Sequence, residues 1–303
     1  MQIMKISTIV VCLALLSGCS PRKMMLSSFT KNLSAESTFL KGEDDPELIK
    51  EALPFTIKFF ETLLEQNKTN PELHLATGKL FVLNAHIFLM LQTDMMDGSD
   101  RNQVTRMRRR AKNHYLRARE HLLNGLEIRH PGIASTIRTG SVDSALIRVT
   151  AADTSYLYWT AASWLGAVGA DRRDLGLGLS ARRAAALLEK TIQLKSDFDN
   201  GSAHETYAVF LASAPSSLGG DMERAKAHYQ KALQYSEGRF ASTFVSGALT
   251  FAVKEKDEQQ FTALLTKASR INPADDDETV FINTVYRDYA RWLLDNKEQF
   301  FSD

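Results

Sequence analysis

The sequence predicts an all-α protein, built as one α-solenoid-like domain of tetratricopeptide-like stacked helical hairpins. Apolar residues recur at intervals of three or four along most of the chain, as they do on the buried face of a helix. The sustained period-two alternation that is typical of strands is missing. Small and aromatic residues also recur at spacings that resemble tetratricopeptide repeats.

The first long helix is expected to begin at the acidic segment 42–46, which ends in Pro46. Acidic side chains complement the dipole of a helix start, and proline has no N–H donor to lose there. Pro54 predicts either a kink or a place in the first turn. Two apolar stripes follow, the second interrupted by polar residues: Leu53, Ile57, Phe60 and Leu64, then Leu73, Thr77, Leu80, Asn84 and Phe88.

Helix ends or interhelical turns are predicted at three dipeptides, because asparagine, aspartate and glycine commonly end helices. They are Asp97-Gly98, Asn124-Gly125 and Asn200-Gly201.

Three partial matches favour stacked repeats over an ordinary helical bundle with alanine-rich crossings, which remains the alternative. The first is Gly220, Ala225, Tyr229 and Ala232; the second is Phe261, Leu265, Ala268 and Pro273; the third is Asn70-Pro71 with Leu75, Gly78 and Phe81. In a stacked array the inner face of the curve is a ready binding surface.

The N-terminus predicts export and lipid attachment. Lys5 precedes a mostly apolar run over 6–16 that is too short for a permanent membrane span. The run closes on Leu16-Ser17-Gly18-Cys19, which resembles a bacterial lipobox with acylation at Cys19. The alternative is an ordinary signal peptide with a chance cysteine. We therefore expect a signal peptide over 1–18, a lipidated tether with a short helix over 19–42, and a helical domain over 43–303.

Composition narrows the chemistry of the mature protein. Only Cys12 and Cys19 are cysteines, so the domain has no thiol for a disulfide, a metal site or a nucleophile. Removing Lys5 with the signal leaves 36 of 37 basic residues against 36 acidic ones. Such a balance gives no general argument for nucleic acid or for an anionic membrane. No apolar run after Leu16 is expected to cross a membrane.

A set of short blocks in a fixed order resembles the TRAP transporter T-component (TatT) lipoprotein family. The blocks are Asp44–Pro54, Asn70–Gly78, Tyr158–Trp164, Gly201–Glu205, Ser217–Gly220, Ala225–Ala232 and Arg291–Leu294. The resemblance implies a tetratricopeptide-like homotrimer that partners a periplasmic solute-binding protein, the P component. It also implies a pore or cavity for a small, hydrophobic ligand. No catalytic motif of the family can be carried over.

His204-Glu205 begins like a zinc-protease motif, but no second histidine follows at the fourth position after His204. Only that spacing places two imidazoles on one helix face. Two interpretations remain open. In one, Asp199 or Asn200 caps a helix and His204 packs against a neighbouring helix. In the other, Asn200, His204 and Glu205 line a ligand cavity.

Aromatic side chains cluster on one predicted helix, at Tyr158, Trp159 and Trp164. Core packing is one interpretation, since these rings carry large apolar surfaces. The other is that one of them faces an apolar cleft that holds a ligand or partner.

Arginines on the predicted helix over 101–119 form two stripes, one with Arg106, Arg110 and Arg117, the other with Arg108, Lys112 and Arg119. This wide cationic face is either solvated or contacts an acidic partner or lipid headgroups.

Together these features predict a non-catalytic, extracytoplasmic protein that a lipid holds on a bacterial envelope membrane, facing the periplasm. We expect no metal, no cofactor and no nucleic acid. Its predicted role is to dock a solute-binding protein and to bind or pass a small ligand. The alternative is an adaptor in envelope assembly that grips peptides or proteins in a tetratricopeptide groove.

Overall fold

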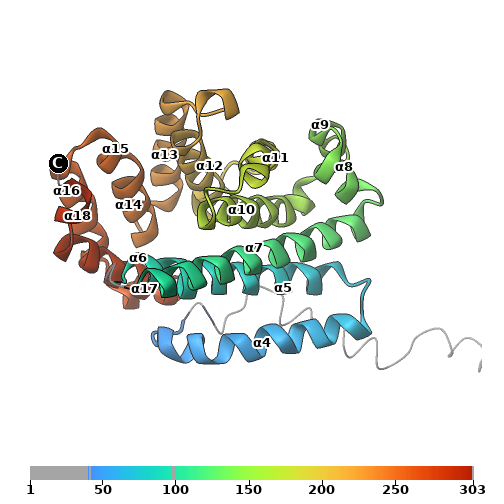
Figure 1. Cartoon of the computed structure of the whole chain (residues 1–303), viewed down its shortest axis with the longest axis horizontal. Helices are drawn as coiled ribbons and strands as arrows, with labels where there is room; N and C mark the ends of the chain where they lie inside the picture. Colours follow the sequence, from blue (N-terminus) through green and yellow to red (C-terminus); the bar gives the residue numbers. More distant parts are fainter. Residues whose placement is uncertain (1–39, 41, 97–99, 302–303) are drawn as a thin grey trace, which may run out of the picture.

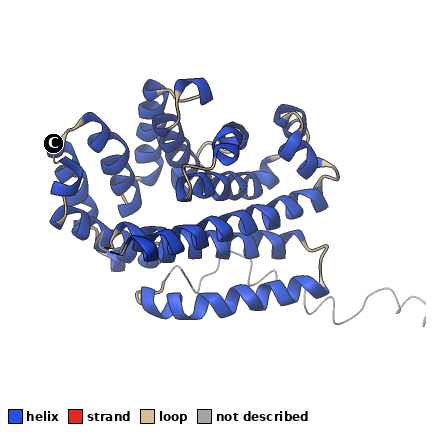
Figure 2. Ribbon diagram, viewed as in Figure 1, coloured by secondary structure: helices blue, strands red, loops and turns tan. Residues whose placement is uncertain are grey.

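The structure is a computed structural model that describes residues 40, 42–96 and 100–301. Every regular element in these residues is helical (Figures 1 and 2). The longer helices are α4 (Pro46–Gln66), α5 (Pro71–Leu83), α7 (Arg101–Arg129), α10 (Thr154–Ala170), α11 (Leu175–Leu194), α12 (Ser202–Ser213), α13 (Met222–Ser236), α16 (Glu258–Arg270) and α17 (Val280–Asp295). The all-α prediction is confirmed for this part of the chain.

Shorter segments connect or extend these helices. They are η1 (Asn84–Leu91), α6 (Gln92–Asp94), α8 (Ile133–Thr139), α9 (Val142–Leu146), η2 (Ala151–Asp153), η3 (Phe198–Gly201), η4 (Ser216–Leu218), α14 (Ala241–Gly247), η5 (Ala248–Ala252), α15 (Val253–Glu255), η6 (Pro273–Asp275) and α18 (Glu298–Phe301). The predicted signal peptide, Cys19, the tether up to residue 39 and the dipeptide Asp97-Gly98 lie outside the described residues.

The first helix begins where the sequence predicts. The Asp45 side chain accepts hydrogen bonds from the backbone of Glu47 and Leu48, and Pro46 is the first helical residue. Pro54 lies in the interior of α4, so the prediction of a first-turn position is wrong. The two predicted stripes are buried, including Thr77 and Asn84.

Consecutive helices pack in pairs, α5 with α7, α10 with α11, α12 with α13, and α14 with α16. Each pair also contacts the next pair along the chain. Small residues permit the close approaches. An added Cβ on Gly78 would lie 2.6 Å from Leu122, and one on Gly166 would lie 2.4 Å from the ring of Tyr115.

One predicted turn is absent because its glycine serves packing. Asn124-Gly125 lies inside α7, and an added Cβ on Gly125 would lie 2.6 Å from the ring of Tyr156. Glycine here lets α10 approach α7, at some cost in helix propensity. The turn predicted at Asn200-Gly201 is confirmed: both residues have positive φ, 54° and 91°, just before α12.

The two ends of the array meet. Phe88 of η1 and Phe281 of α17 have ring centroids 6.4 Å apart, and α17 also contacts α4. Together with the contacts of α7 with α10, α10 with α12, α12 with α14, and α14 with α17, this closes a ring of helices (Figure 1).

The segment Pro71–Asp94 runs from α5 through the π-helical η1 to α6 and is long and apolar enough to span a membrane. By its length and composition, this segment contradicts the expectation that no apolar run after Leu16 could cross a membrane. However, 67% of its most apolar window is buried inside the protein, as in the core helix of a soluble domain.

Candidate functional site

The candidate site is the inner face of the helical ring, and its first wall is one stripe of α5 and η1. Leu75, Lys79, Leu83, His86 and Met90 recur at spacings of three and four, and all keep some exposure to solvent. The opposite stripe, which runs from Leu73 to Phe88, is buried in the core. Helical geometry therefore directs the exposed stripe away from the core of this helix.

Side chains of this stripe reach across to other helices of the ring. The Lys79 ammonium lies 5.3 Å from the ring centroid of Trp159 on α10. His86 Nε2 lies 2.6 Å from the Tyr286 hydroxyl of α17, and its Nδ1 lies 3.4 Å from the Tyr115 hydroxyl of α7. These contacts place the stripe on the side that faces α10 and α17.

Glu205 of α12 and Tyr158 of α10 form the opposite wall. Thr243 of α14 donates a hydrogen bond of 2.9 Å to Glu205 Oε2. The Tyr158 hydroxyl lies 3.4 Å from the hydroxyl of Thr206. Burial raises the pKa of the Glu205 carboxyl, which disfavours its charged form.

The polar groups of this inner face are neutral or hard to ionise. Burial lowers the pKa of His86 to about 4, although water reaches its side chain. Burial raises the pKa of Tyr158, and burial together with the charge of Glu205 raises the pKa of Tyr286.

Apolar side chains complete the inner face. They are half-buried, in contrast to the fully buried core: Leu75, Leu83, Met90 and Trp159. Gly169 of α10 has no atom within 4 Å of the place where a Cβ would stand. The face thus combines apolar surface with a few convergent polar groups, the mixture that is typical of small-molecule sites.

The predicted residues divide between this face and the core. Trp159, Glu205 and the hydroxyl of Tyr158 contribute to the inner face. Trp164 does not, because its Nε1 donates to Ser180 of α11 and its ring lies 4.6 Å from the guanidinium carbon of Arg119. Residues His86, Tyr115 and Tyr286 were not predicted, since no local pattern relates residues 200 positions apart.

His204 packs against a neighbouring helix, as in the first of the two interpretations of His204-Glu205. Its Nδ1 lies 2.8 Å from Nδ1 of His228 on α13, and its Nε2 lies 3.1 Å from the Ser196 hydroxyl. Burial lowers the pKa of His204 to about 4, with His228 and Lys231 acting in the same direction. Within the described residues, no cluster of three or more histidine, cysteine or carboxylate side chains fits a metal ion.

The predicted cap of α12 is wrong. Gly201 is the N-cap, and no side chain caps this helix end. Asp199 and Asn200 have a left-handed backbone and precede this N-cap. Asn200 instead accepts a hydrogen bond of 2.9 Å from Arg239, outside the contacts that define the inner face.

The predicted cationic face is only partly free. Ion pairs neutralise the second stripe: Arg108 with Asp94, Lys112 with Asp171 and Asp174, and Arg119 with Glu120. Arg117 pairs with Glu61 and lies 4.5 Å over the ring of Phe81. Arg106 and Arg110 are exposed and have no ion pair among the described residues.

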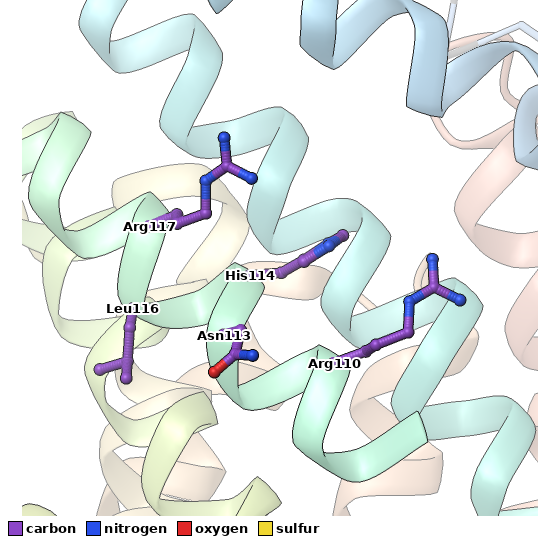
Figure 3. Close-up of a pocket in the computed structure, with 5 residues that line it drawn as sticks. All are labelled: Arg110, Asn113, His114, Leu116 and Arg117. Carbon is purple, nitrogen blue, oxygen red and sulfur yellow. The ribbon is translucent and has the colours of Figure 1, made fainter. Parts of the chain in front are cut away.

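A surface recess of about 510 Å³ adjoins this face; its lining residues are Arg110, Asn113, His114, Leu116 and Arg117. Figure 3 shows that Arg110, His114 and Arg117 point to one side of α7, whereas Asn113 and Leu116 point elsewhere. Buried Nδ1 of His114 has no hydrogen-bond partner. Burial, together with Arg110 and Arg117, lowers the pKa of His114 to about 4.

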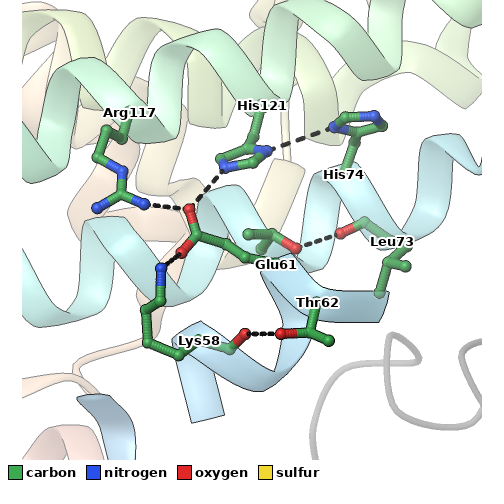
Figure 4. A network of polar contacts seen from close by, with 8 residues as sticks. Lys58, Glu61, Thr62, Leu73, His74, Arg117 and His121 are labelled. Carbon is green, nitrogen blue, oxygen red and sulfur yellow. Dashed lines mark hydrogen bonds and ion pairs between the residues drawn. The ribbon is translucent and has the colours of Figure 1, made fainter. Parts of the chain in front are cut away.

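Beside the recess, α4 and α7 are joined through Glu61 (Figure 4). Lys58 pairs with Glu61 at 2.7 Å, and His121 Nε2 lies 3.7 Å from the same carboxylate. Burial opposes its ionisation, but the bonds from Lys58 and Arg117 prevail and lower the pKa of Glu61. Lys58 and Arg117 are therefore paired within the protein and are less available to contact a partner.

Comparison with known proteins gives two findings. The family model described as TRAP transporter T-component matches residues 42–301 of this chain. A protein of Treponema pallidum (strain Nichols), itself uncharacterized, is 25% identical over 306 residues, which cover 95% of each chain.

Proposed function

The chain belongs to the TRAP transporter T-component family, and from that premise we propose that it is a lipid-anchored, non-catalytic accessory protein of a TRAP transport system. It docks a periplasmic solute-binding protein and binds or passes a small, largely apolar ligand. Membership of this family supports the accessory role in transport. The lipid anchor, the docking of a solute-binding protein and the binding of a ligand are our proposal.

The inner face of the ring is the single observation that carries the ligand part of this proposal. We interpret the paired helices as tetratricopeptide-like hairpins that form a curved array, whose inner side is the usual binding surface. Half-buried Trp159 and Leu83 supply apolar contact there, and Tyr286 and His86 supply hydrogen-bonding groups.

The lipobox supports attachment through Cys19 to an envelope membrane, with the helical domain facing the periplasm. Such a tether raises the local concentration of docking partners, so that weak recognition suffices. The described domain then begins about 20 residues from the acyl chains.

Arg106 and Arg110 support docking of an acidic surface. Both are exposed on α7 without an ion pair among the described residues. Charge complementarity of this kind speeds the encounter of the two proteins and sets their relative orientation more than it strengthens their binding. The partner we propose for this face is the folded solute-binding protein.

The test is cross-linking in intact envelopes with the lipidated full-length protein as bait. We expect the wild type to recover a solute-binding protein. The variant with Arg106→Glu and Arg110→Glu should recover on the order of tenfold less, because like charges then meet at the interface. A matched control changes the exposed Lys68 and Lys231 to Glu and should recover the wild-type amount.

Equal loss in both variants would show a general charge effect and would contradict the assignment of this face. Recovery of an envelope-assembly factor in place of a solute-binding protein would favour the adaptor function.

We also propose a homotrimer. A closed ring of three copies uses two different surfaces on each copy, because its interfaces are heterologous. Large apolar side chains are exposed at two places in the described chain: Leu48, Phe55 and Phe59 on α4, and Ile147, Leu175 and Leu179 on and beside α9 and α11. Figure 1 shows α4 far from α9 and α11, with α5, α7 and α10 between them.

A further inference from the structure

The strongest unassigned feature is the chain of hydrogen bonds formed by Tyr115, His86 and Tyr286 on the inner face. His86 lies between the two hydroxyls, 3.4 Å from that of Tyr115 and 2.6 Å from that of Tyr286. The three groups come from α7, η1 and α17, so they meet where the two ends of the array close the ring.

The three side chains of this hydrogen-bonded group have one more donor than their two hydrogen bonds use. A neutral imidazole carries one N–H, and each tyrosine carries one O–H. The two hydrogen bonds use two of these three donors, whichever tautomer His86 adopts. Burial lowers the pKa of His86 and raises the pKa of Tyr115 and Tyr286, so all three groups stay neutral near pH 7.

The spare donor therefore sits on one of the tyrosine hydroxyls. In one tautomer Tyr286 donates to Nε2, and Nδ1–H donates to Tyr115, whose O–H is free. In the other tautomer the free O–H belongs to Tyr286. Neither hydroxyl has another acceptor among the described residues. Because water reaches His86, this part of the inner face is also open to a ligand.

The burial of these groups selects the kind of acceptor. Burial is the main cause that raises the pKa of Tyr115 and of Tyr286, so a negative charge is disfavoured at both hydroxyls. An anionic head group placed there would lose its hydration at the same cost. His86 cannot offset it, since the imidazole is uncharged.

We propose that Tyr115, His86 and Tyr286 bind the head of an amphipathic ligand that carries an uncharged hydrogen-bond acceptor, such as an ester or amide carbonyl. Its apolar tail lies along Leu83, Met90 and Trp159. This assignment rests on the proposed ligand site of the ring and adds the chemical class of the head group. It also makes Tyr115 and Tyr286 residues that determine specificity.

A matched series of twelve-carbon probes tests the assignment: methyl dodecanoate and dodecanamide with a neutral acceptor, dodecanoate with an anion, and dodecane with no head. Binding is measured on the purified full-length protein in amphipol, with empty amphipol subtracted. Tryptophan fluorescence is the readout, and Trp159→Phe shows how much of the change comes from the inner face.

We expect the ester and the amide to bind about fivefold to tenfold more tightly than dodecane, the value of one hydrogen bond. Dodecanoate should bind more weakly than the ester. Tyr286→Phe combined with Tyr115→Phe should abolish the preference for the ester while dodecane binding persists. Tyr235→Phe is the control, because its hydroxyl bonds Ser196 at 2.9 Å, away from this site.

Equal binding of dodecane and ester by the wild type would overturn the head-group assignment and leave the ligand site of the ring intact. Tighter binding of dodecanoate would overturn it in favour of an anion site. Failure of every probe to bind would contradict the ligand part of the proposed function together with this inference.

Discussion

Gly166 and Gly169 both lie on α10, and they differ in the atoms that an added Cβ would meet. An added Cβ at Gly166 would lie 2.4 Å from the ring of Tyr115, which is buried, whereas nothing lies within 4 Å of one at Gly169. We expect Gly166→Ala to lower the free energy of unfolding by about 1–3 kcal/mol, as overpacked cores do. Gly169→Ala is the matched control and should raise it by up to about 1 kcal/mol through helix propensity.

Urea unfolding followed by circular dichroism checks both variants. The same sign of change for Gly166→Ala and Gly169→Ala would contradict the packing of α7 against α10 at Tyr115.

Single residues could be predicted where the physics is local. Asp45 and Pro46 were recognised as a helix start because a cap needs only the next few residues of the chain. Gly125 was misassigned because asparagine followed by glycine looks the same at a helix end as at a close helix crossing. What decides between them is Tyr156, which approaches Gly125 only in the folded protein.

At the scale of elements, neutral histidines join helices in pairs. His204 of α12 meets His228 of α13 at 2.8 Å, and His74 of α5 meets His121 of α7 at 3.4 Å. Burial lowers the pKa of each of these four side chains. The pairs therefore favour packing of the helices only while the imidazoles remain uncharged.

The sign of the pH dependence follows from this shift. For His204 the pKa is 6.5 in the unfolded chain and about 4 in the folded one. Between these values the unfolded chain binds more protons, so stability is fully present above pH 6.5 and falls as pH drops towards 4. His204 is almost fully buried, and we expect it to contribute a slope of about 1.4 kcal/mol per pH unit.

Urea unfolding at pH 7.0, 6.0 and 5.0 measures this slope. His204→Asn should have a shallower slope than the wild type, because asparagine retains hydrogen-bonding groups but does not titrate. An unchanged slope would show that His204 is not the neutral buried group that the structure indicates.

Helix type and approximate extent could be predicted from periodicity, and the buried stripes of α4 and α5 agree with it. The π-helical turns of η1 could not, since apolar periodicity alone does not distinguish a π-helical turn from an α-helical one. The exposed stripe nevertheless continues through these turns, where His86 and Met90 keep the spacing of three and four residues.

At the scale of the whole molecule, the closed ring was beyond what the sequence could predict. The closure depends on His86 with Tyr286 and Phe88 with Phe281, pairs separated by about 200 residues. Repeat patterns describe only contacts between neighbouring units. The sequence thus indicated a curved array and three residues of its inner face, Tyr158, Trp159 and Glu205. It did not indicate the contact of the two ends, where the spare hydroxyl lies.

The two exposed apolar patches make the trimer testable by complementation. Phe55→Asp with Phe59→Asp removes the α4 patch, and Leu175→Asp with Leu179→Asp removes the patch on α11. In a ring with heterologous interfaces each change breaks every contact, so both variants should be monomers by light scattering. Lys231→Glu is the control and should leave the trimer intact.

Mixing the two variants separates a heterologous ring from other assemblies. The intact α11 patch of the first variant can still receive the intact α4 patch of the second, so one interface forms and no third copy can add. The expected mixture contains heterodimers, whereas a trimer built on one of the patches alone would give monomers in one variant only. Trimers in both separate variants would contradict the use of these patches.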